Sequence, residues 1–81
     1  MAPVGENLIH IQMGAFSSAD NAARLKDQVS QVHAAFVHRA IVNDHQYYRV
    51  RLGPFSSVAE AEHIHARLRE AGFSGARITV D

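Results

Sequence analysis

The 81-residue sequence contains no cysteine. This absence excludes a disulfide bond, a thiolate metal site and a cysteine nucleophile, although it identifies no compartment. No apolar run approaches the roughly 18 residues that a membrane-spanning helix needs. Met1–Asn7 also lacks the charged and apolar regions of a signal peptide. The chain starts abruptly, as a piece of a longer protein would, so we expect any targeting signal to lie outside it.

Net charge is also lacking, because eight acidic residues balance eight basic ones. A domain held to DNA or RNA by bulk charge would carry an excess of Lys and Arg, so the balance argues against such a partner. The charges are nevertheless unevenly distributed. The arginines in segments that we predict to be strands are Arg39, Arg49, Arg51 and Arg77. The acidic residues in predicted helices are Asp20, Asp27, Glu60, Glu62 and Glu70. One layer of the fold is therefore expected to be basic and the other mixed to acidic.

An internal repeat is the most informative feature that is present. Ile11–Ser18 read IQMGAFSS, and about 39 residues later Val50–Ser57 read VRLGPFSS. Each copy predicts a strand, a Gly-containing corner, a Ser-capped helix and a second strand. With 81 residues and an apolar share of 47%, the chain has room for one small domain. We therefore expect the two copies to pair into a single two-layer unit.

The periodicity of apolar residues predicts the order βαββαβ and an α+β fold. The strands are predicted at Leu8–Ala15, Phe36–Val42, Tyr47–Gly53 and Ala76–Val80. The helices are predicted from Ala19 to about Val32 and over Val58–Ala71. The predicted core consists of Ile9, Ile11, Met13, Leu25, Val29, Val50, Leu52, Ile64, Leu68 and Ile78. Residues 8–81 are taken as the domain and residues 1–7 as a flexible N-terminal segment.

Several local features refine this outline. Asn43–Gln46 is predicted to be a turn, and Pro54 is expected to end strand pairing because it cannot donate a hydrogen bond. Ser57 with Glu60 predicts a helix capping box, and Gly72 is placed to follow the helix end. The inward face of the strand at 36–42 stays open, because both of its faces contain apolar residues.

Only one face of most predicted strands is apolar, so both helices should cover one face of the sheet and leave the other open. The open face is predicted to carry His10, Gln12, Tyr47, Arg49, Arg51, Arg77 and Thr79. Arginines without acids, an aromatic ring and an amide fit a shallow groove for an extended anionic or polar polymer. The guanidinium groups would pair with carboxylates or phosphates, and Tyr47 would offer a flat surface. An ordinary polar face that happens to be rich in arginine is the alternative.

Other chemistry is poorly supported. The corner at Gly53–Ser57 is best interpreted as structural, whereas Ser17 and Ser18 in the first copy could equally bind a ligand oxygen at a helix N-terminus. His63 and His65 are two residues apart, hence on different helix faces, and no HExxH pattern occurs. We therefore expect no metal and no cofactor. Neither a base beside a nucleophile nor a carboxylate pair is evident, so no enzymatic activity is expected.

With these features the chain resembles the SPOR (sporulation-related repeat) family of bacterial cell-envelope domains, over roughly Leu8–Val80. The resemblance rests on Ile11–Ser18, Ala22, Ala23, Leu25, Tyr48–Ser57, Glu60–Glu62 and Ala71–Phe73. It implies a four-stranded antiparallel sheet with two helices on one face, as in RNA-recognition and ferredoxin-like domains. It also implies binding of denuded peptidoglycan glycan, the GlcNAc-MurNAc polymer without stem peptides. The parent protein would thereby be brought to the division septum, in the periplasm or cell envelope.

Matched by position, the resemblance implicates Gln12, Tyr47, Arg49 and Arg77, with Ala15, Phe16 and Ser17 at the rim. The family often has an aromatic residue where Tyr47 stands, Arg at Arg49, and an apolar residue where Arg77 stands. Together with Arg51 from the predicted open face, the candidate glycan-binding residues are Gln12, Ala15, Phe16, Ser17, Tyr47, Arg49, Arg51 and Arg77.

Two other functions remain as alternatives. One is a protein-docking or dimerisation domain, and the other is a single-stranded RNA-binding module of the same topology. Binding of RNA is disfavoured, because Gln12 and Arg51 occupy the positions at which such modules have aromatic residues that stack on bases. We expect no nucleic acid and no direct membrane contact. A lytic transglycosylase of the rare-lipoprotein-A kind is the parent most similar to this pattern, ahead of a division protein or an amidase. Oligomeric state, affinity and preferred glycan length are left open.

Overall fold

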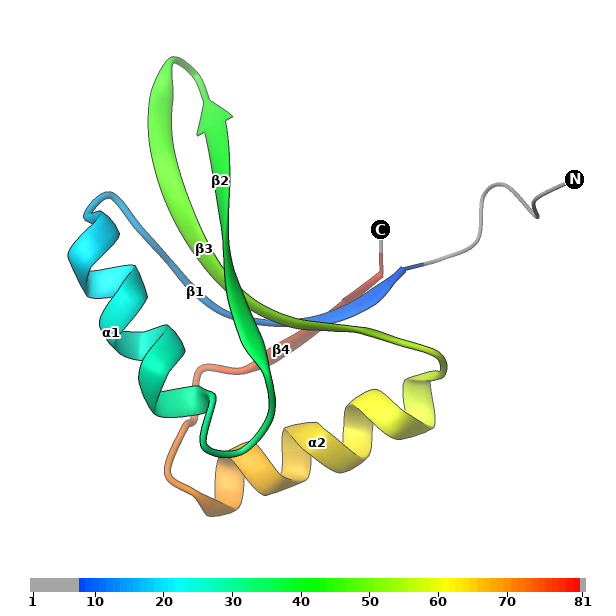
Figure 1. Cartoon of the computed structure of the whole chain (residues 1–81). Helices are drawn as coiled ribbons and strands as arrows, with labels where there is room; N and C mark the ends of the chain where they lie inside the picture. The colour runs from blue at the N-terminus through cyan, green and yellow to red at the C-terminus, as the bar shows by residue number, and fades with distance from the viewer. Residues whose placement is uncertain (1–7, 81) are drawn as a thin grey trace, which may run out of the picture.

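A computed structural model describes residues 8–80 of the chain as a four-stranded sheet with two helices on one side (Figure 1). In chain order the elements are β1 (Ile9–Phe16), α1 (Ala19–Val29), β2 (Ala35–Val42), β3 (His45–Phe55), α2 (Val58–Glu70) and β4 (Arg77–Val80). The strand order is β2-β3-β1-β4, and every neighbouring pair is antiparallel. The predicted α+β class and βαββαβ order are confirmed. The predicted flexible segment 1–7 lies outside the described residues.

The two repeated strands, β1 and β3, form the centre of the sheet and pair with each other. Their ladder contains two register shifts, one between Ile9 and Ile11 and one between Gln12 and Gly14. Strict alternation would place Ala15 on the same side as Ile11 and the core. The second shift inserts an extra residue, as β-bulges do, and so Ala15 pairs with Arg49. The bulge therefore moves Ala15 to the side of the sheet that the helices leave uncovered.

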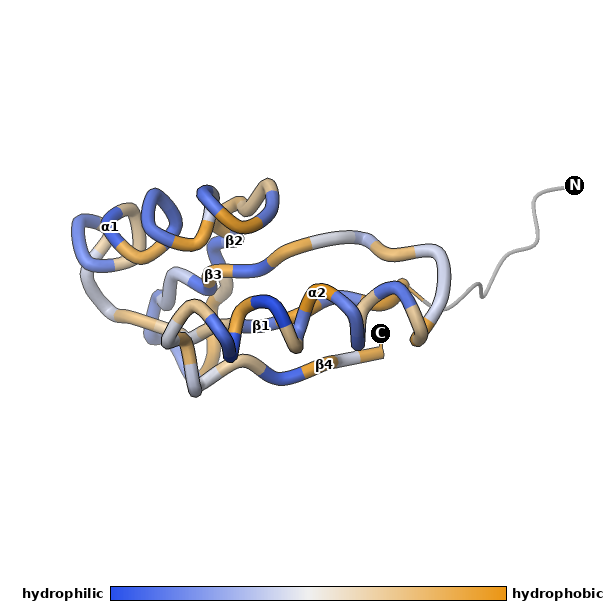
Figure 2. Tube along the Cα trace, turned by 90° about the horizontal axis from the view of Figure 1, so that it is seen from below, coloured by the Kyte–Doolittle hydropathy of each residue, from blue (hydrophilic) through white to orange (hydrophobic). Residues whose placement is uncertain are grey.

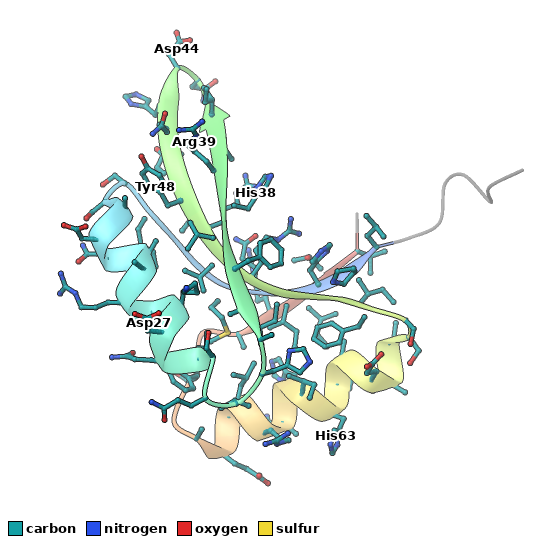
Figure 3. All side chains as sticks on the ribbon, viewed as in Figure 1. Asp27, His38, Arg39, Asp44, Tyr48 and His63 are labelled. Carbon is teal, nitrogen blue, oxygen red and sulfur yellow. The ribbon has the colours of Figure 1, made fainter. Side chains whose placement is uncertain are left out.

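The β2–β3 hairpin closes with a two-residue turn. Asn43 and Asp44 have φ values of 52° and 66°, and positive φ at both central residues is typical of the type I′ turn that matches strand twist. The four-residue turn predicted over 43–46 is too long, because His45 already pairs with Val42. This turn sets the register and resolves the inward face of β2. His38 and Tyr48 accordingly project to opposite sides of the hairpin (Figure 3).

The prediction that pairing stops at Pro54 is wrong. β3 continues to Phe55, whose Cα partner is Ile9, because a register shift accommodates the extra residue on β3. Gly53 makes this possible. Its φ is +121°, and an added Cβ would lie 3.0 Å from the carbonyl oxygen of Ile9. At Gly14, the equivalent residue in the first copy, an added Cβ would make only ordinary contacts, at 3.4 Å or more, so only the second corner requires glycine.

The helices begin and end at recognisable signals. Ser18 caps α1 by accepting a hydrogen bond from the amide of Asn21, and α1 ends at Val29, earlier than predicted. Ser57 caps α2 through the amide of Glu60 at 3.1 Å. Beyond α2, Gly72 has a φ of +100°.

The end of α2 forms a Schellman motif. The amide of Phe73 donates to the carbonyl of Leu68 at 2.9 Å, and that of Gly72 donates to Arg69. Gly72 therefore occupies the position that the sequence predicted for it.

The core lies between the helices and the sheet. Its buried residues are Ile9, Ile11, Met13, Ala22, Val29, Val50, Leu52, Phe55, Ala61, Ile64, Leu68 and Ala76. Leu25 and Ile78, which were predicted to be core, are partly buried and pack against it. Hydrophobic and hydrophilic residues alternate along both helices (Figure 2). No helix within residues 8–80 is long and apolar enough to cross a membrane.

Candidate functional site

The side of the sheet opposite the helices, which we call the open face, carries basic and other polar residues together with four apolar ones. Strand register places on it His10, Gln12, Ala15, Phe36, His38, Ala40, Val42, His45, Tyr47, Arg49, Arg51, Arg77 and Thr79. No strand of the described chain contains an acidic residue. Within residues 8–80, Arg49 and Arg77 therefore have no carboxylate on a neighbouring strand.

One row of side chains crosses all four strands, in the order Phe36, Arg51, Gln12 and Arg77. Arg51 is only 8% exposed, and its Nη2 donates to Oγ1 of Thr79 on β4 at 3.2 Å. Its guanidinium group is thus held across β1, which ties three strands together. Arg51 is therefore better suited to shaping the face than to reaching out to a ligand.

The end of the open face near His10 is closed by the protein's own side chains. His10 is 6% exposed, and its ring meets that of Phe36 edge to face at a centroid distance of 6.0 Å. Gly53 lies beside it, with no room for a side chain because the ring carbon Cδ2 of His10 would be 3.1 Å from an added Cβ. This end consequently offers little polar surface to a ligand.

The other end of the open face is more accessible. His38, Arg49 and Ala15 lie in one row across β2, β3 and β1. The small side chain of Ala15 leaves the β1 side of Arg49 uncrowded. Tyr47 follows on β3, partly buried, with its ring 6.5 Å from that of His45. An arginine, an aromatic ring and two imidazoles are therefore presented together.

The charges of Arg49 and Arg77 are available to a ligand. Within residues 8–80 neither forms a salt bridge; the ion pair found there joins Lys26 to Asp27 on α1 at 3.5 Å. A guanidinium group presents a fork of donors that matches a carboxylate or a phosphate. The open face can therefore bind an anion at two separate places.

The structure brings together six of the predicted site residues on the open face: Gln12, Ala15, Tyr47, Arg49, Arg51 and Arg77. Phe16 lies apart, because it pairs with Tyr48 on the helix-covered side and packs against the core. Ser17 is exposed and directly precedes the helix cap. As binding residues all eight remain predictions. Sequence reasoning missed Phe36 and His38, and a two-residue turn at Asn43-Asp44 was the signal that would have placed them.

The remaining titratable groups have structural surroundings. Nε2 of His65 lies 2.9 Å from the carbonyl oxygen of Ala76, and His63 points away from the sheet (Figure 3). Hydrogen bonds from the backbone amide and then the hydroxyl of Ser56 lower the pKa of Glu60 below its ordinary value. In the described part of the chain, no three His, Cys, Asp or Glu side chains gather to form a candidate metal site.

An open antiparallel sheet backed by two helices and built from a repeated strand–corner–helix unit defines the class of this domain. The model of the SPOR domain family matches residues 5–79. The chain therefore belongs to the SPOR domain family.

Among known proteins, the chain is similar to the endolytic peptidoglycan transglycosylase RlpA of Pseudomonas aeruginosa, in strains UCBPP-PA14 and PAO1. The identity is 37% over 65 residues, covering 78% of this chain and 19% of RlpA. The chain thus spans about a fifth of the length of these relatives.

Two solved structures share the fold. The crystal structure of the RlpA SPOR domain from P. aeruginosa matches with a TM-score of 0.79 and 32% identity, covering 88% of this chain and 96% of that one. The solution structure of the peptidoglycan binding domain of the Bacillus subtilis cell wall lytic enzyme CwlC matches with a TM-score of 0.74 and 28% identity, covering 93% and 90%. The similarity is to binding domains and not to the lytic parts of these enzymes. The chain is accordingly a binding domain rather than an enzyme.

Proposed function

We propose that this SPOR domain binds peptidoglycan glycan strands that lack stem peptides, and that it does so through the open face. In this way it would hold the protein that carries it at the division septum, in the cell envelope. The observation that carries the proposal is the acid-free face on which Arg49 and Arg77 have no salt bridge within the described residues. Membership of the SPOR family, and the peptidoglycan-binding domain among its structural neighbours, support it.

The chemistry of the glycan matches this face. Removal of the stem peptide leaves a free lactyl carboxylate on each MurNAc unit, and a guanidinium group binds a carboxylate through two parallel hydrogen bonds. The ring of Tyr47 offers a flat apolar surface for a sugar ring, as aromatic side chains do. The amide of Gln12 both donates and accepts hydrogen bonds, as an N-acetyl group or a hydroxyl requires. In a strand that retains its peptides the same carboxylate is consumed in an amide bond, so the charge is lost.

The separation of the two arginines indicates more than one sugar unit. Arg49 is on β3 and Arg77 on β4, with β1 between them. Arg49 also lies one open-face row away from the row that contains Arg77. From ordinary strand spacing and rise, their Cα atoms are about 12 Å apart. Side chains stand roughly perpendicular to a sheet, so each of the two guanidinium groups can bind a carboxylate of its own. We therefore expect a glycan with two or more free carboxylates to bind better than a single disaccharide.

Co-sedimentation with purified sacculi tests the proposal. The domain should pellet with sacculi treated with an amidase that removes stem peptides, and more weakly with untreated sacculi. A third preparation, in which the freed carboxylates are converted to methyl amides, separates charge from steric access and should bind as weakly as the untreated one. Equal binding to all three preparations contradicts the selectivity. Failure to bind any of them, or preference for single-stranded RNA, contradicts the function.

Localisation is tested separately. A fluorescent fusion exported to the cell envelope should form a band at the septum of dividing cells, and the Arg49→Ala variant should spread around the periphery. A septal band that survives this substitution would show that the open face is not what directs the domain there.

A further inference from the structure

The edge strand β2 exposes apolar side chains on both of its faces. Phe36 and Val42 lie on the open face, and Val37 and Ile41 lie on the opposite side. Ile41 is 72% exposed, the most of the exposed large apolar residues in the described chain. β2 has 8 residues, whereas β4 at the other edge has 4. The long edge is therefore also the apolar one.

An edge of this kind is a template for another strand, because it presents a row of backbone donors and acceptors without partners from its own sheet. Natural sheets protect such edges with proline, lysine or a bulge. β2 contains no proline or lysine, and it pairs with β3 without a register shift. Its one permanently charged side chain is Arg39, which lies on the helix side opposite Tyr48. The edge is thus open to strand addition.

We propose that β2 pairs antiparallel with β2 of a second copy of this chain. The strand is apolar on both faces and so complements itself, and the chain has a formal net charge of zero, so no long-range repulsion opposes self-association. A two-fold axis perpendicular to the sheet leaves the open faces of both copies on the same side of the joined sheet. The two sheets would join into one of eight strands, in which both open faces point the same way.

The charge on β2 selects the register. Like charges directly opposite each other destabilise a sheet, which excludes a two-fold axis at Arg39. An axis at Ala40 would pair only residues 38–42. An axis at His38 pairs residues 35–41 of each copy, with Arg39 opposite Val37 of the second copy and Ile41 opposite Ala35. The axis then brings the His38 side chains of the two copies opposite each other.

The dimer would have a consequence for binding that rests on the proposed function. The two-fold axis turns the second open face by 180° in the plane of the sheet, so the dimer could engage two neighbouring glycan strands that run in opposite directions, and binding of the first strand raises the effective concentration of the second face near the other. Dimerisation is nevertheless measured without glycan, so it can succeed or fail independently of glycan binding.

Sedimentation equilibrium at pH 8 provides the test, with each variant shown folded by circular dichroism. The unmodified domain should approach twice its monomer mass as concentration rises. In the dimer, Val37→Lys places a lysine of each copy opposite Arg39 of the other copy. The like charges at these two symmetry-related positions should weaken dimerisation at least tenfold. Val37→Glu places an anion there and should preserve or strengthen it. Val58→Lys, at an exposed apolar position on α2, is the matched control and should leave the dimer intact.

A disulfide test addresses the same register, because the chain has no cysteine of its own. His38→Cys should form a covalent dimer under mild oxidation at least ten times faster than Ala23→Cys on the exposed side of α1. A domain that stays monomeric at millimolar concentration overturns the proposal. Equal loss of the dimer in Val37→Glu and Val37→Lys, or equal oxidation rates, also overturns it.

Discussion

Replacing Arg49 with alanine is expected to weaken binding of a soluble, peptide-free glycan about 5- to 150-fold, or about 1–3 kcal/mol. Arg49 is partly buried and lies in the row with His38 and Ala15. Within residues 8–80 no carboxylate forms a salt bridge with it, so a ligand carboxylate would be its charged partner. A hydrogen bond to a charged group contributes about 1.5–3 kcal/mol, and partial exposure to water reduces this. Arg77 is exposed, so its removal should cost only about 0–1 kcal/mol.

Isothermal titration of a denuded oligosaccharide against folded variants measures these losses. Arg67→Ala is the matched control, because Arg67 is exposed on α2 and its removal changes the net charge by the same amount. Arg49→Lys should retain only part of the affinity, since lysine keeps the charge but not the two-pronged geometry. If Arg67→Ala weakens binding as much as Arg49→Ala, the glycan lies on the helical side and the open-face reasoning is refuted.

Three further predictions concern other parts of the molecule. Leu68→Ala should lower the free energy of unfolding by about 2–5 kcal/mol, because Leu68 is fully buried; a urea titration with an unchanged midpoint would show that the face of α2 is wrongly assigned. The pKa of the Glu60 carboxyl, measured by NMR, should lie below the ordinary value for glutamate. A pKa that is lower in the folded state stabilises the domain above the unfolded pKa, so this contribution should vanish as pH falls through the folded pKa. Glu60→Gln should remove that pH dependence. Ala15→Phe should crowd Arg49 and block glycan binding, whereas Ala23→Phe, on the exposed surface of α1, should not.

Much of the fold could be predicted because its signals are local. The alternation of Tyr48, Val50 and Leu52 against Tyr47, Arg49 and Arg51 assigns the faces of β3 with no knowledge of its partners. The apolar spacing in α2 and the glycine after it gave the helix nearly to its end. The repeat then implied that β1 has the same role as β3. For these elements the hydrophobic pattern and the tertiary structure agree.

The errors come from pairing, which no single segment encodes. The extent of the Asn43-Asp44 turn decides which residues of β2 and β3 meet, and the polar His45 and Gln46 made the loop look longer. The shift between Gln12 and Gly14 turns Ala15 over, and only the partner strand reveals it. These two irregularities determine what surrounds Arg49.

The burial of Arg51 could not be predicted for a similar reason. In the sequence Arg49 and Arg51 look equivalent, since both alternate outward on the same strand. Arg51 reaches Thr79 on a strand that lies beyond β1, so its role depends on a contact between residues 28 positions apart. The row that contains Arg49 ends at Ala15 on β1, because β4 pairs only with residues 9–12 of β1. No residue of β4 therefore lies in that row to partner Arg49.

The same contrast explains how a sheet built from a repeat can present an asymmetric site. Gln12 and Arg51 are equivalent positions in the two copies, and they pair with each other at the centre of the sheet. On one side of this pair His10 is buried, and its ring meets that of Phe36 edge to face. On the other side the equivalent position holds Arg49, and its charge is not neutralised within the described chain. A glycan strand differs at its two ends, so it meets different chemistry depending on its direction. We therefore expect this face to accept the strand in one direction only.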